Sequence, residues 1–550
     1  MKTYIHVKYI TLVLLFVWNT NSQFFRNDIQ TTSGPIRGTR VYFAGRTLKQ
    51  YLGIPYAKPP VGQLRFKKPE PVERRCETYF ADKMPPACIQ YTEYPFPWYD
   101  LQDGKSEDCL YLNIWVPDGL LSGFYEKYSV MFWIHGGGFT FGSNRMQIYE
   151  GQALAAMGDV VVVTINFRLG VFGYLTSGTE EAPGNAGVYD MVEALKWVNQ
   201  NIAAFGGDPE KVTLFGESSG SIAVGLLCVS PLTKGLFHRV IMQSSSPAYL
   251  LAENNTANIA MSQQLAKAIG CADDCTTIQS DPETVVGCLR DEDAFVLART
   301  FSSFNPTSTR SFLPSYGDEV LPRNAREEII NGNFHNVDVL ICNTKDEGSF
   351  HITTGNPNLF GFFGEKNTWI NKSYGETMIR KSFGSFSFPD PEAVVRYYLG
   401  DLAEGDYNQV REQVYTSTGD FISLCPSVYF AESYSSAGND VYFFLFVHRP
   451  STTPWAQWMG VAHYEDVQFV FGLPLRAPKN YTTWESMLSR KMIKIWTDFT
   501  KRGSSVWTNW PQYSREDPTY IELDTGFITR SGKGPHKENC DFYREYFGFD

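Results

Sequence analysis

The feature that most constrains this chain is a short, mostly apolar run that stops at a glycine and passes directly into a helix-like run. The stretch is KVTLFGESSGSIAVGLLCV, residues 211–229. Its first five residues are β-prone and end at a turn signal, which predicts a buried strand. The residues from 221 onward predict a helix. A buried strand joined to a helix is the unit from which parallel sheets with helices on both faces are built.

The same alternation recurs along the chain. The runs 129–134 (SVMFWI) and 159–167 (DVVVVTINF) predict strands, and the second is too continuously apolar to be half-exposed. Residues 191–205 have helical spacing, and the runs 337–343 and 441–447 predict further strands. We therefore predict an α/β fold with a large, mostly parallel central sheet and helices on both faces.

Two stretches, about residues 250–330 and 350–435, have a looser and more helical pattern. We interpret them as helical cap insertions rather than as separate domains. The chain shows no internal repeat and no low-complexity linker, and its 43% hydrophobic residues suffice for a sizeable core. Although 550 residues exceed the usual domain size, we predict a single domain over residues 23–550.

The first 22 residues have the pattern of a secretory signal peptide. Lys2 and Lys8 give a positive start, residues 9–18 form a short apolar run, and residues 20–22 are small or polar, as at a cleavage site. The apolar run is too short to span a bilayer comfortably, which disfavours an N-terminal membrane anchor. We therefore expect a secreted, extracellular protein without a membrane anchor.

The composition excludes some partners and fits secretion. A net charge of -11 argues against a nucleic-acid partner, which needs a basic face. Ten cysteines favour disulfides in a secreted chain, while Cys228 and Cys342 stand in apolar runs and predict buried free thiols. Sequons at Asn254, Asn371 and Asn480 predict glycosylation. No assembly segment is evident, so we expect a monomer or a loose homodimer.

Gly216, Ser218 and Gly220 have the spacing of a nucleophile elbow. In this motif a serine occupies a tight turn between a strand and a helix, and the flanking glycines let the backbone pack closely. The spacing selects Ser218 rather than Ser219 as the reacting hydroxyl. An ordinary turn is the alternative, and the strand before the motif and the helix after it favour the elbow.

The glycine-rich run HGGGF, residues 135–139, follows another predicted strand. Its glycines let backbone N–H groups approach a substrate oxygen without obstruction by a Cβ atom. In the elbow motif the residue after the nucleophile, here Ser219, donates its own N–H to the same oxyanion hole. The alternative interpretation of HGGGF is a flexible turn.

The acid and the histidine are narrowed by elimination. In this motif's fold the chain order is serine, acid, histidine. Asp346 and Glu347 follow the strand VDVLICN, and a carboxylate just beyond a strand end lies on the catalytic edge of a sheet. His351 is too close to this acid in sequence to fold back onto it from a separate loop. His463, in an aromatic-rich loop, is favoured over His448, which ends a strand.

Five motifs in order resemble the type-B carboxylesterase and cholinesterase family of α/β-hydrolases. They are EDCLYLNIWVP (107–117), HGGGF (135–139), FGGDPEKVTLFGESSG (205–220), KDEGSF (345–350) and WMGVAHYEDVQFVFGLPL (458–475). The resemblance runs from about residue 30 to about residue 545. It is closer to the cholinesterase branch, especially over LPLRAPKNYTTWESMLSRKMIKIWTDF. It implies a serine esterase that uses neither a metal nor an organic cofactor.

The resemblance also implies roles for individual residues. The acid is then Glu347 rather than Asp346, and the histidine is His463. The oxyanion donors are the backbone N–H groups of Gly137, Gly138 and Ser219. The family's cross-links imply disulfides Cys88–Cys109, Cys425–Cys540 and Cys288 with Cys271 or Cys275, of which we prefer Cys271, and salt bridges Arg65–Glu107 and Arg168–Asp190.

The same resemblance places residues in the substrate pocket. Glu217 and Phe350 match residues at the choline end of a cholinesterase gorge. Trp98 is the candidate ring for stacking on a quaternary ammonium, although it lies one residue out of register from Cys109; a packing tryptophan is the alternative.

Several positions depart from the acetylcholinesterase pattern. Ser308 and Arg310 stand where two aromatic residues narrow the acyl pocket. Thr140 replaces a tyrosine, and Tyr464-Glu465 replaces a Gly-Tyr pair after the histidine. These departures argue against a tight acetyl site.

The sequence thus predicts a secreted serine carboxylesterase whose partner is a small-molecule ester. A cholinesterase with relaxed acyl specificity is the first alternative. A non-catalytic adhesion protein of the same family is the second, and the presence of all three triad residues disfavours it.

Overall fold

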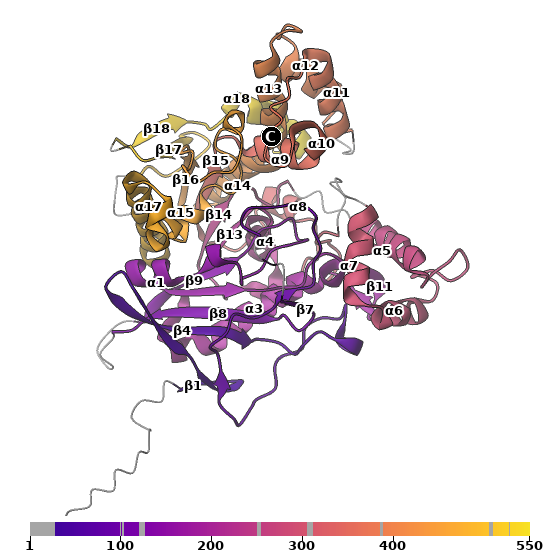
Figure 1. Cartoon of the computed structure of the whole chain (residues 1–550), viewed down its shortest axis with the longest axis vertical. Helices are drawn as coiled ribbons and strands as arrows, with labels where there is room; N and C mark the ends of the chain where they lie inside the picture. The colour runs from indigo at the N-terminus through magenta and orange to yellow at the C-terminus, as the bar shows by residue number, and fades with distance from the viewer. Residues whose placement is uncertain are drawn as a thin grey trace, which may run out of the picture.

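The computed structural model describes residues 28–99, 101, 104–119, 127–249, 255–304, 312–384, 389–504, 510–526 and 528–549. Within these ranges, eleven strands form a central sheet in the order β18-β17-β16-β15-β14-β13-β9-β10-β8-β4-β3 (Figure 1). The strands from β17 to β10 run parallel, and antiparallel strands flank them at both edges. This arrangement confirms the predicted α/β fold with a mostly parallel sheet.

The strands of the central sheet have these bounds: β3 Thr39–Phe43, β4 Arg46–Pro55, β8 Tyr111–Pro117, β9 Tyr128–Ile134, β10 Val161–Ile165, β13 Gly207–Glu217, β14 Arg239–Gln243, β15 Asp338–Thr344, β16 Val441–Phe446, β17 Thr519–Leu523 and β18 Arg530–Lys533. The small sheets contain β1 Asp28–Thr31, β2 Gly34–Arg37, β5 Tyr79–Phe80, β6 Ala87–Cys88, β7 Lys105–Ser106, β11 Thr176–Thr179 and β12 Ala182–Pro183. All five apolar runs predicted as strands are strands of the central sheet.

The helices have these bounds: α1 Gln152–Gly158, α2 Gly170–Tyr174, α3 Ala186–Asn201, α4 Ser219–Val229, α5 Thr256–Ile269, α6 Pro282–Asp291, α7 Ala294–Phe304, α8 Ala325–Ile330, α9 Glu347–Gly355, α10 Pro357–Phe360, α11 Lys372–Phe383, α12 Pro391–Leu399, α13 Tyr407–Gly419, α14 Cys425–Ser436, α15 Val467–Val470, α16 Leu473–Arg476, α17 Thr483–Arg502 and α18 Lys537–Phe547. The two helical stretches expected from the sequence, around 191–205 and 221–229, correspond to α3 and α4.

The sheet is buried on both faces, which is why its strands are continuously apolar. Along β9, Phe132 and Ile134 belong to one hydrophobic cluster, while Met131 and Trp133 belong to a second. Successive side chains of a strand point to opposite faces, so the two clusters lie on the two sides of the sheet. Helices α3, α4 and α14 contribute to the first cluster, and α1, α15 and α17 contribute to the second.

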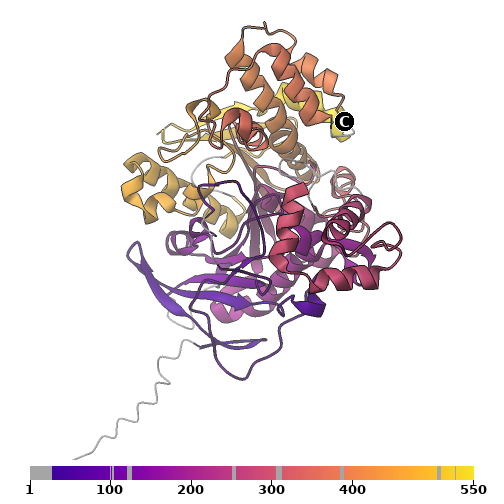
Figure 2. The same cartoon turned by 45° about the vertical axis from the view of Figure 1, so that its right-hand side comes forward.

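Two groups of helices extend beyond these layers. Helices α5, α6 and α7 lie together beside the sheet, and α11, α12 and α13 lie together beyond its β15–β18 end (Figures 1 and 2). They occupy the two stretches predicted as helical insertions. That residues 23–550 form one domain stays a prediction.

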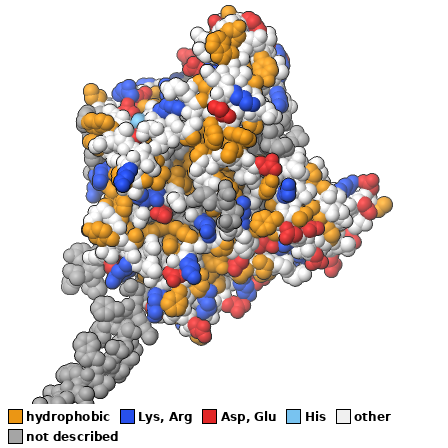
Figure 3. All heavy atoms as spheres, in the orientation of Figure 1, with side chains coloured by type: hydrophobic (Ala, Val, Ile, Leu, Met, Phe, Trp, Pro, Cys, Tyr) orange, Lys and Arg blue, Asp and Glu red, His pale blue; other side chains and the backbone are white. Residues whose placement is uncertain are grey.

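On the face shown in Figure 3, Lys and Arg side chains are interspersed with Asp and Glu.

The cross-links implied by the family resemblance are present. The disulfides are Cys88–Cys109, Cys271–Cys288 and Cys425–Cys540. Cys271 rather than Cys275 is thus the partner of Cys288. The predicted ion pairs Arg65–Glu107 and Arg168–Asp190 are also formed, at 2.6 Å and 2.7 Å. Cys228 and Cys342 are buried free thiols, as predicted.

The segments relevant to export and surface modification are only partly described. The predicted signal peptide, residues 1–22, and the sequon residue Asn254 lie outside the described residues. Asn371 is half-buried and Asn480 is exposed. Among the described helices, none is both long and apolar enough to cross a membrane.

Candidate active site

Ser218 occupies a strained turn between β13 and α4. Its backbone has φ 57° and ψ −125°, a conformation that residues with a side chain seldom adopt. A Cβ atom on Gly216 would lie 2.5 Å from the carbonyl carbon of Gly220, and one on Gly220 would lie 2.2 Å from the carbonyl oxygen of Ile134. Both flanking glycines are therefore sterically required, and the turn has the geometry of a nucleophile elbow.

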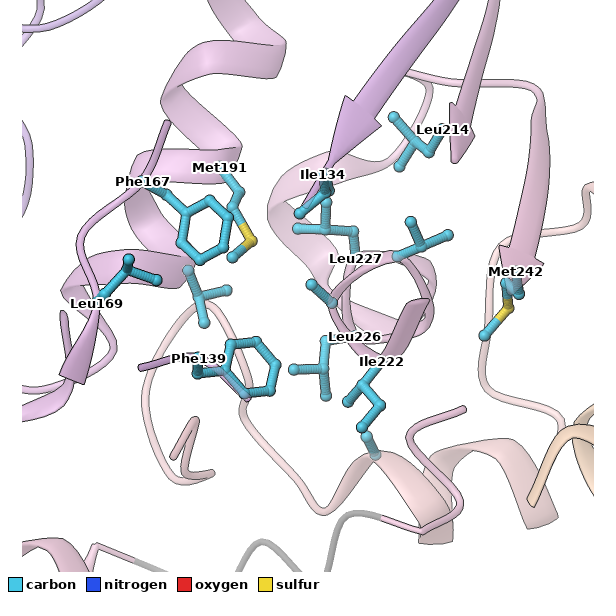
Figure 4. Packing of buried hydrophobic residues seen from close by; sticks show 14 of the residues in the cluster. Ile134, Phe139, Phe167, Leu169, Met191, Leu214, Ile222, Leu226, Leu227 and Met242 are labelled. Atoms are coloured by element: carbon cyan, nitrogen blue, oxygen red, sulfur yellow. The ribbon is translucent and has the colours of Figure 1, made fainter. Parts of the chain in front are cut away.

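A packed apolar cluster holds the helix that follows the elbow. Figure 4 shows Ile222, Leu226 and Leu227 of α4 among apolar side chains of the neighbouring strands and loops, including Ile134 and Met242. Because α4 is fixed on this side, its first residue and the serine before it have a defined position at the end of β13.

The glycine-rich loop lies directly against the elbow. A Cβ atom on Gly136 would lie 3.2 Å from the Cβ atom of Ser218 and 2.7 Å from the carboxylate of Glu217. Gly137 and Gly138 have φ values of 114° and 61°. In the described part of the chain, no hydrogen bond engages the N–H of either glycine. These N–H groups are therefore free to donate to a substrate oxygen.

Ser219 begins α4, so its N–H is one of the first-turn donors without a partner inside the helix. The side-chain hydroxyl of Ser219 makes a separate contact that the sequence pattern does not reveal. The buried Ser219 Oγ accepts a hydrogen bond of 3.2 Å from the N–H of Phe139. The side chain thus links the glycine-rich loop to helix α4.

The Ser219→Ala variant is expected to lose stability rather than chemistry. The substitution keeps the backbone N–H of residue 219 but leaves the buried N–H of Phe139 without its acceptor. We expect the free energy of unfolding to fall by about 1 kcal/mol and kcat to fall by less than about tenfold. Urea unfolding and steady-state kinetics measure the two effects. A hundredfold loss of kcat in a folded variant would assign the hydroxyl a chemical role.

His463 and Glu347 form a buried pair. The Nδ1 atom of His463 lies 2.5 Å from Oε2 of Glu347. Glu347 is the first residue of α9, three residues beyond the end of β15. Its other oxygen accepts hydrogen bonds from the N–H of Thr344 at 2.8 Å and from the Asn343 amide at 3.2 Å. These donors fix the carboxylate so that it orients the imidazole.

Asp346 and His448, the alternative acid and the alternative histidine, have other partners. Asp346 accepts hydrogen bonds from the N–H of Val461 at 2.9 Å and from the hydroxyl of Tyr415 at 3.2 Å. It therefore holds the loop that leads to the histidine rather than the imidazole itself. His448 lies 3.2 Å from Glu485, away from this site.

Glu217, the residue before the candidate nucleophile, lies at the other side of the imidazole. Its Oε1 atom is 3.0 Å from Nε2 of His463. Among the described contacts there is no hydrogen bond between His463 and Ser218; catalytic hydrogen bonds often tighten only when substrate binds. The sequence placed Glu217 in the substrate pocket, whereas its nearest charged neighbour is the histidine.

Burial and charge act in opposite directions on His463. Burial alone would lower the pKa of the imidazole, but the carboxylates of Glu217 and Glu347 outweigh it and raise that pKa above its ordinary value. For Glu347, burial would raise the pKa, and the charge and hydrogen bond of His463 lower it. Burial raises the pKa of Glu217. The site therefore holds positive charge on His463 more readily than water does.

The Glu217→Gln variant is expected to shift the pH profile. A general base must be neutral, so with His463 in the predicted role of base, kcat/KM is expected to rise with pH through the pKa of His463. Removing the carboxylate of Glu217, one of those that raise the pKa of His463, should lower that pKa. We expect the acidic limb of kcat/KM to move to lower pH by about one unit. Measurements of kcat/KM from pH 4 to pH 10 locate the acidic limb. A shift of this limb to higher pH would contradict the pairing of Glu217 with His463.

Aromatic side chains line the space beside the histidine. The Phe350 ring lies 5.4 Å from the imidazole of His463 between centroids, and it also packs against Trp98 at 6.2 Å. His351, set aside by the sequence argument as an acid partner, lies 5.0 Å from the same imidazole. Apart from the adjacency of His351 to Phe350, nothing in the sequence pattern indicates this contact. Ser308 and Arg310, predicted for the acyl side, lie outside the described residues.

Comparison with known proteins agrees with this arrangement. The family model described as the carboxylesterase family matches residues 26–543. This chain belongs to the carboxylesterase family. It is 40% identical to "Acetylcholinesterase-1" of Trittame loki, over 99% of each chain. It is 33% identical to the acetylcholinesterase of Leptinotarsa decemlineata, over 94% of this chain and 85% of that one. It is also 33% identical to the cholinesterase of Mus musculus, over 94% and 86% respectively.

The family match confirms the resemblance, and the 33–40% identity to cholinesterases confirms that it lies closer to the cholinesterase-like branch. Membership of the family makes the chain a carboxylic ester hydrolase of the α/β-hydrolase fold.

Proposed function

We propose that this carboxylesterase-family chain is a secreted serine esterase that forms an acyl-enzyme on Ser218. One observation carries the proposal: the strained elbow of Ser218 lies against the glycine-rich loop, where the N–H groups of Gly137 and Gly138 have no partner among the described residues. The buried His463–Glu347 pair lies beside the same elbow, since Glu217 contacts the imidazole. Nucleophile, base, orienting acid and oxyanion donors are thus all supplied.

In the proposed mechanism, His463 accepts the proton of Ser218 Oγ as that oxygen attacks the ester carbonyl. The negative oxygen of the tetrahedral intermediate accepts hydrogen bonds from the N–H groups of Gly137, Gly138 and Ser219. The intermediate collapses, and His463 gives its proton to the departing alcohol. Water then attacks the acyl-enzyme by the same route and releases the acid. Glu347 stabilises the imidazolium during both acylation and deacylation.

Secretion is part of the proposal. It is supported by the signal-like pattern of residues 1–22 and by three disulfides, which persist in oxidising compartments. N-terminal sequencing of the protein recovered from the medium of expressing cells tests it. A mature chain that begins near residue 23 is expected, and a chain retained in the cells with its first 22 residues would contradict it.

A choline esterase with relaxed acyl specificity is the second candidate. It is favoured by the printed names of the relatives, which are cholinesterases, and by the position of Phe350 beside the histidine. An adhesion protein without turnover is disfavoured because a complete set of catalytic groups is present.

Hydrolysis of nitrophenyl and thiocholine esters of increasing acyl length tests these functions together. A serine carboxylesterase hydrolyses the neutral nitrophenyl esters and accepts acyl chains longer than acetyl. Strong preference for acetylthiocholine over both longer and neutral esters would select the acetylcholine-specific function instead. Absence of any hydrolysis by the folded protein would favour adhesion.

A further inference from the structure

The surroundings of Trp98 restrict the alcohol end of a substrate. Tyr464 lies on the indole: the two ring centroids are 4.4 Å apart and the ring planes are inclined by 33°. Phe96 stacks on the same indole at 5.3 Å, and Trp455 approaches it at 5.9 Å. Rings 4.4 Å apart are in van der Waals contact. A quaternary ammonium therefore cannot enter between Trp98 and Tyr464.

Tyr464 is held in this position against a backbone preference. Its φ is 80°, in the left-handed region that a glycine adopts freely and a tyrosine does not. Such a conformation persists only where the surroundings fix it. Here the buried Tyr464 hydroxyl donates a 2.9 Å hydrogen bond to the hydroxyl of Tyr149, and only 8% of the residue is exposed. The Tyr464 ring is thus held in a fixed position on the indole of Trp98.

Carboxylates close to Tyr464 in space or in sequence already have partners, among them Asp466, whose Oδ2 accepts from the Gln243 amide at 2.7 Å. The carboxylate of Glu217 lies 3.0 Å from Nε2 of His463 and is therefore already paired with the imidazole. Glu465, the residue after Tyr464, accepts hydrogen bonds from Thr453 at 2.5 Å and from the Gln468 amide at 3.1 Å. A cationic leaving group therefore meets neither an open aromatic face nor an uncommitted carboxylate among these residues.

We propose that Tyr464 closes the ammonium site on Trp98, so that this enzyme takes esters of uncharged alcohols. The inference rests on the proposed esterase function and adds the class of the leaving group. Tyr464 acts here as a specificity-determining residue beside His463. The chain thereby differs from the choline-ester function that the names of its relatives suggest.

The test compares two substrates that differ only in charge: S-butyrylthiocholine and its carbon isostere, the 3,3-dimethylbutyl thioester of butyric acid. In the natural enzyme we expect kcat/KM for the cation to be no greater than for the isostere. Tyr464→Gly should raise the cation-to-isostere ratio on the order of tenfold, the scale of a desolvated cation–π contact. Adding Trp98→Ala to Tyr464→Gly should abolish the gain. Tyr464→Phe, which keeps the ring, should show no gain.

Two further measurements keep the outcomes distinct. Trp98→Ala in the natural background should leave the ratio unchanged, and this holds whether or not Tyr464→Gly folds. Calorimetric titration with tetramethylammonium should show no binding to the natural enzyme, a readout that needs no turnover. A natural ratio well above one that Trp98→Ala removes, or tetramethylammonium binding that Trp98→Ala removes, would overturn the proposal. Loss of all ester hydrolysis would instead overturn the esterase function, while the titration still tests the closed site.

Discussion

The Ser218→Ala variant is expected to lose kcat on the order of a millionfold, as occurs when the nucleophile of a serine hydrolase triad is removed. The residual rate comes from substrate binding and the oxyanion donors, which remain. Alanine has to adopt the same positive φ as Ser218, so the turn is no more strained than before. Single-turnover hydrolysis of a nitrophenyl ester, with high enzyme concentration, measures the residual rate.

Ser219→Ala is the matched control for this variant, because it removes a hydroxyl from the adjacent residue and leaves the elbow serine in place. It should retain most of the activity. If Ser218→Ala kept activity within tenfold while Ser219→Ala lost it, the roles of the two serines would have to be exchanged.

The Glu347→Gln variant is expected to lose kcat on the order of ten-thousandfold. The amide fits the same space between Thr344 and His463, but it lacks the negative charge that stabilises the imidazolium. The substitution also removes one of the carboxylates that raise the pKa of His463. Steady-state kinetics across the pH range measures the loss, and near-ultraviolet circular dichroism checks that the fold is kept.

Asp346→Asn is the control that separates the two neighbouring acids. Asp346 bonds to Val461 and Tyr415 rather than to the imidazole, so its replacement should reduce kcat by about tenfold or less through the position of the loop. A larger loss for Asp346→Asn than for Glu347→Gln would reverse the assignment.

Much of the fold follows from the sequence because its strands are buried on both faces. A run such as DVVVVTINF cannot be half-exposed, and each such run lies in the central sheet as β10 does. The elbow also has a local signal, since the two glycines around Ser218 are required by contacts under 3 Å. The disulfide partner of Cys288 could be predicted only from the family resemblance, because spacing alone does not select Cys271 over Cys275.

Contacts between distant segments could not be predicted in the same way. The sequence identifies Trp98 and Tyr464 as unusual, but 366 positions separate them, and only the fold places one ring on the other. The same holds for Ser219 and Phe139, whose hydrogen bond joins two loops, and for the contact of Glu217 with His463. Each depends on how the ends of several strands meet at one edge of the sheet.

The central claim is that Ser218 becomes acylated, and covalent trapping tests it most directly. A fluorophosphonate reacts with the nucleophile of serine hydrolases and leaves a stable adduct whose position peptide mass spectrometry reports. We expect one adduct per chain, on Ser218 within the peptide that contains FGESSG, and none in the Ser218→Ala variant. An adduct on Ser219 or on another residue of the natural enzyme, or labelling that persists in Ser218→Ala, would contradict it.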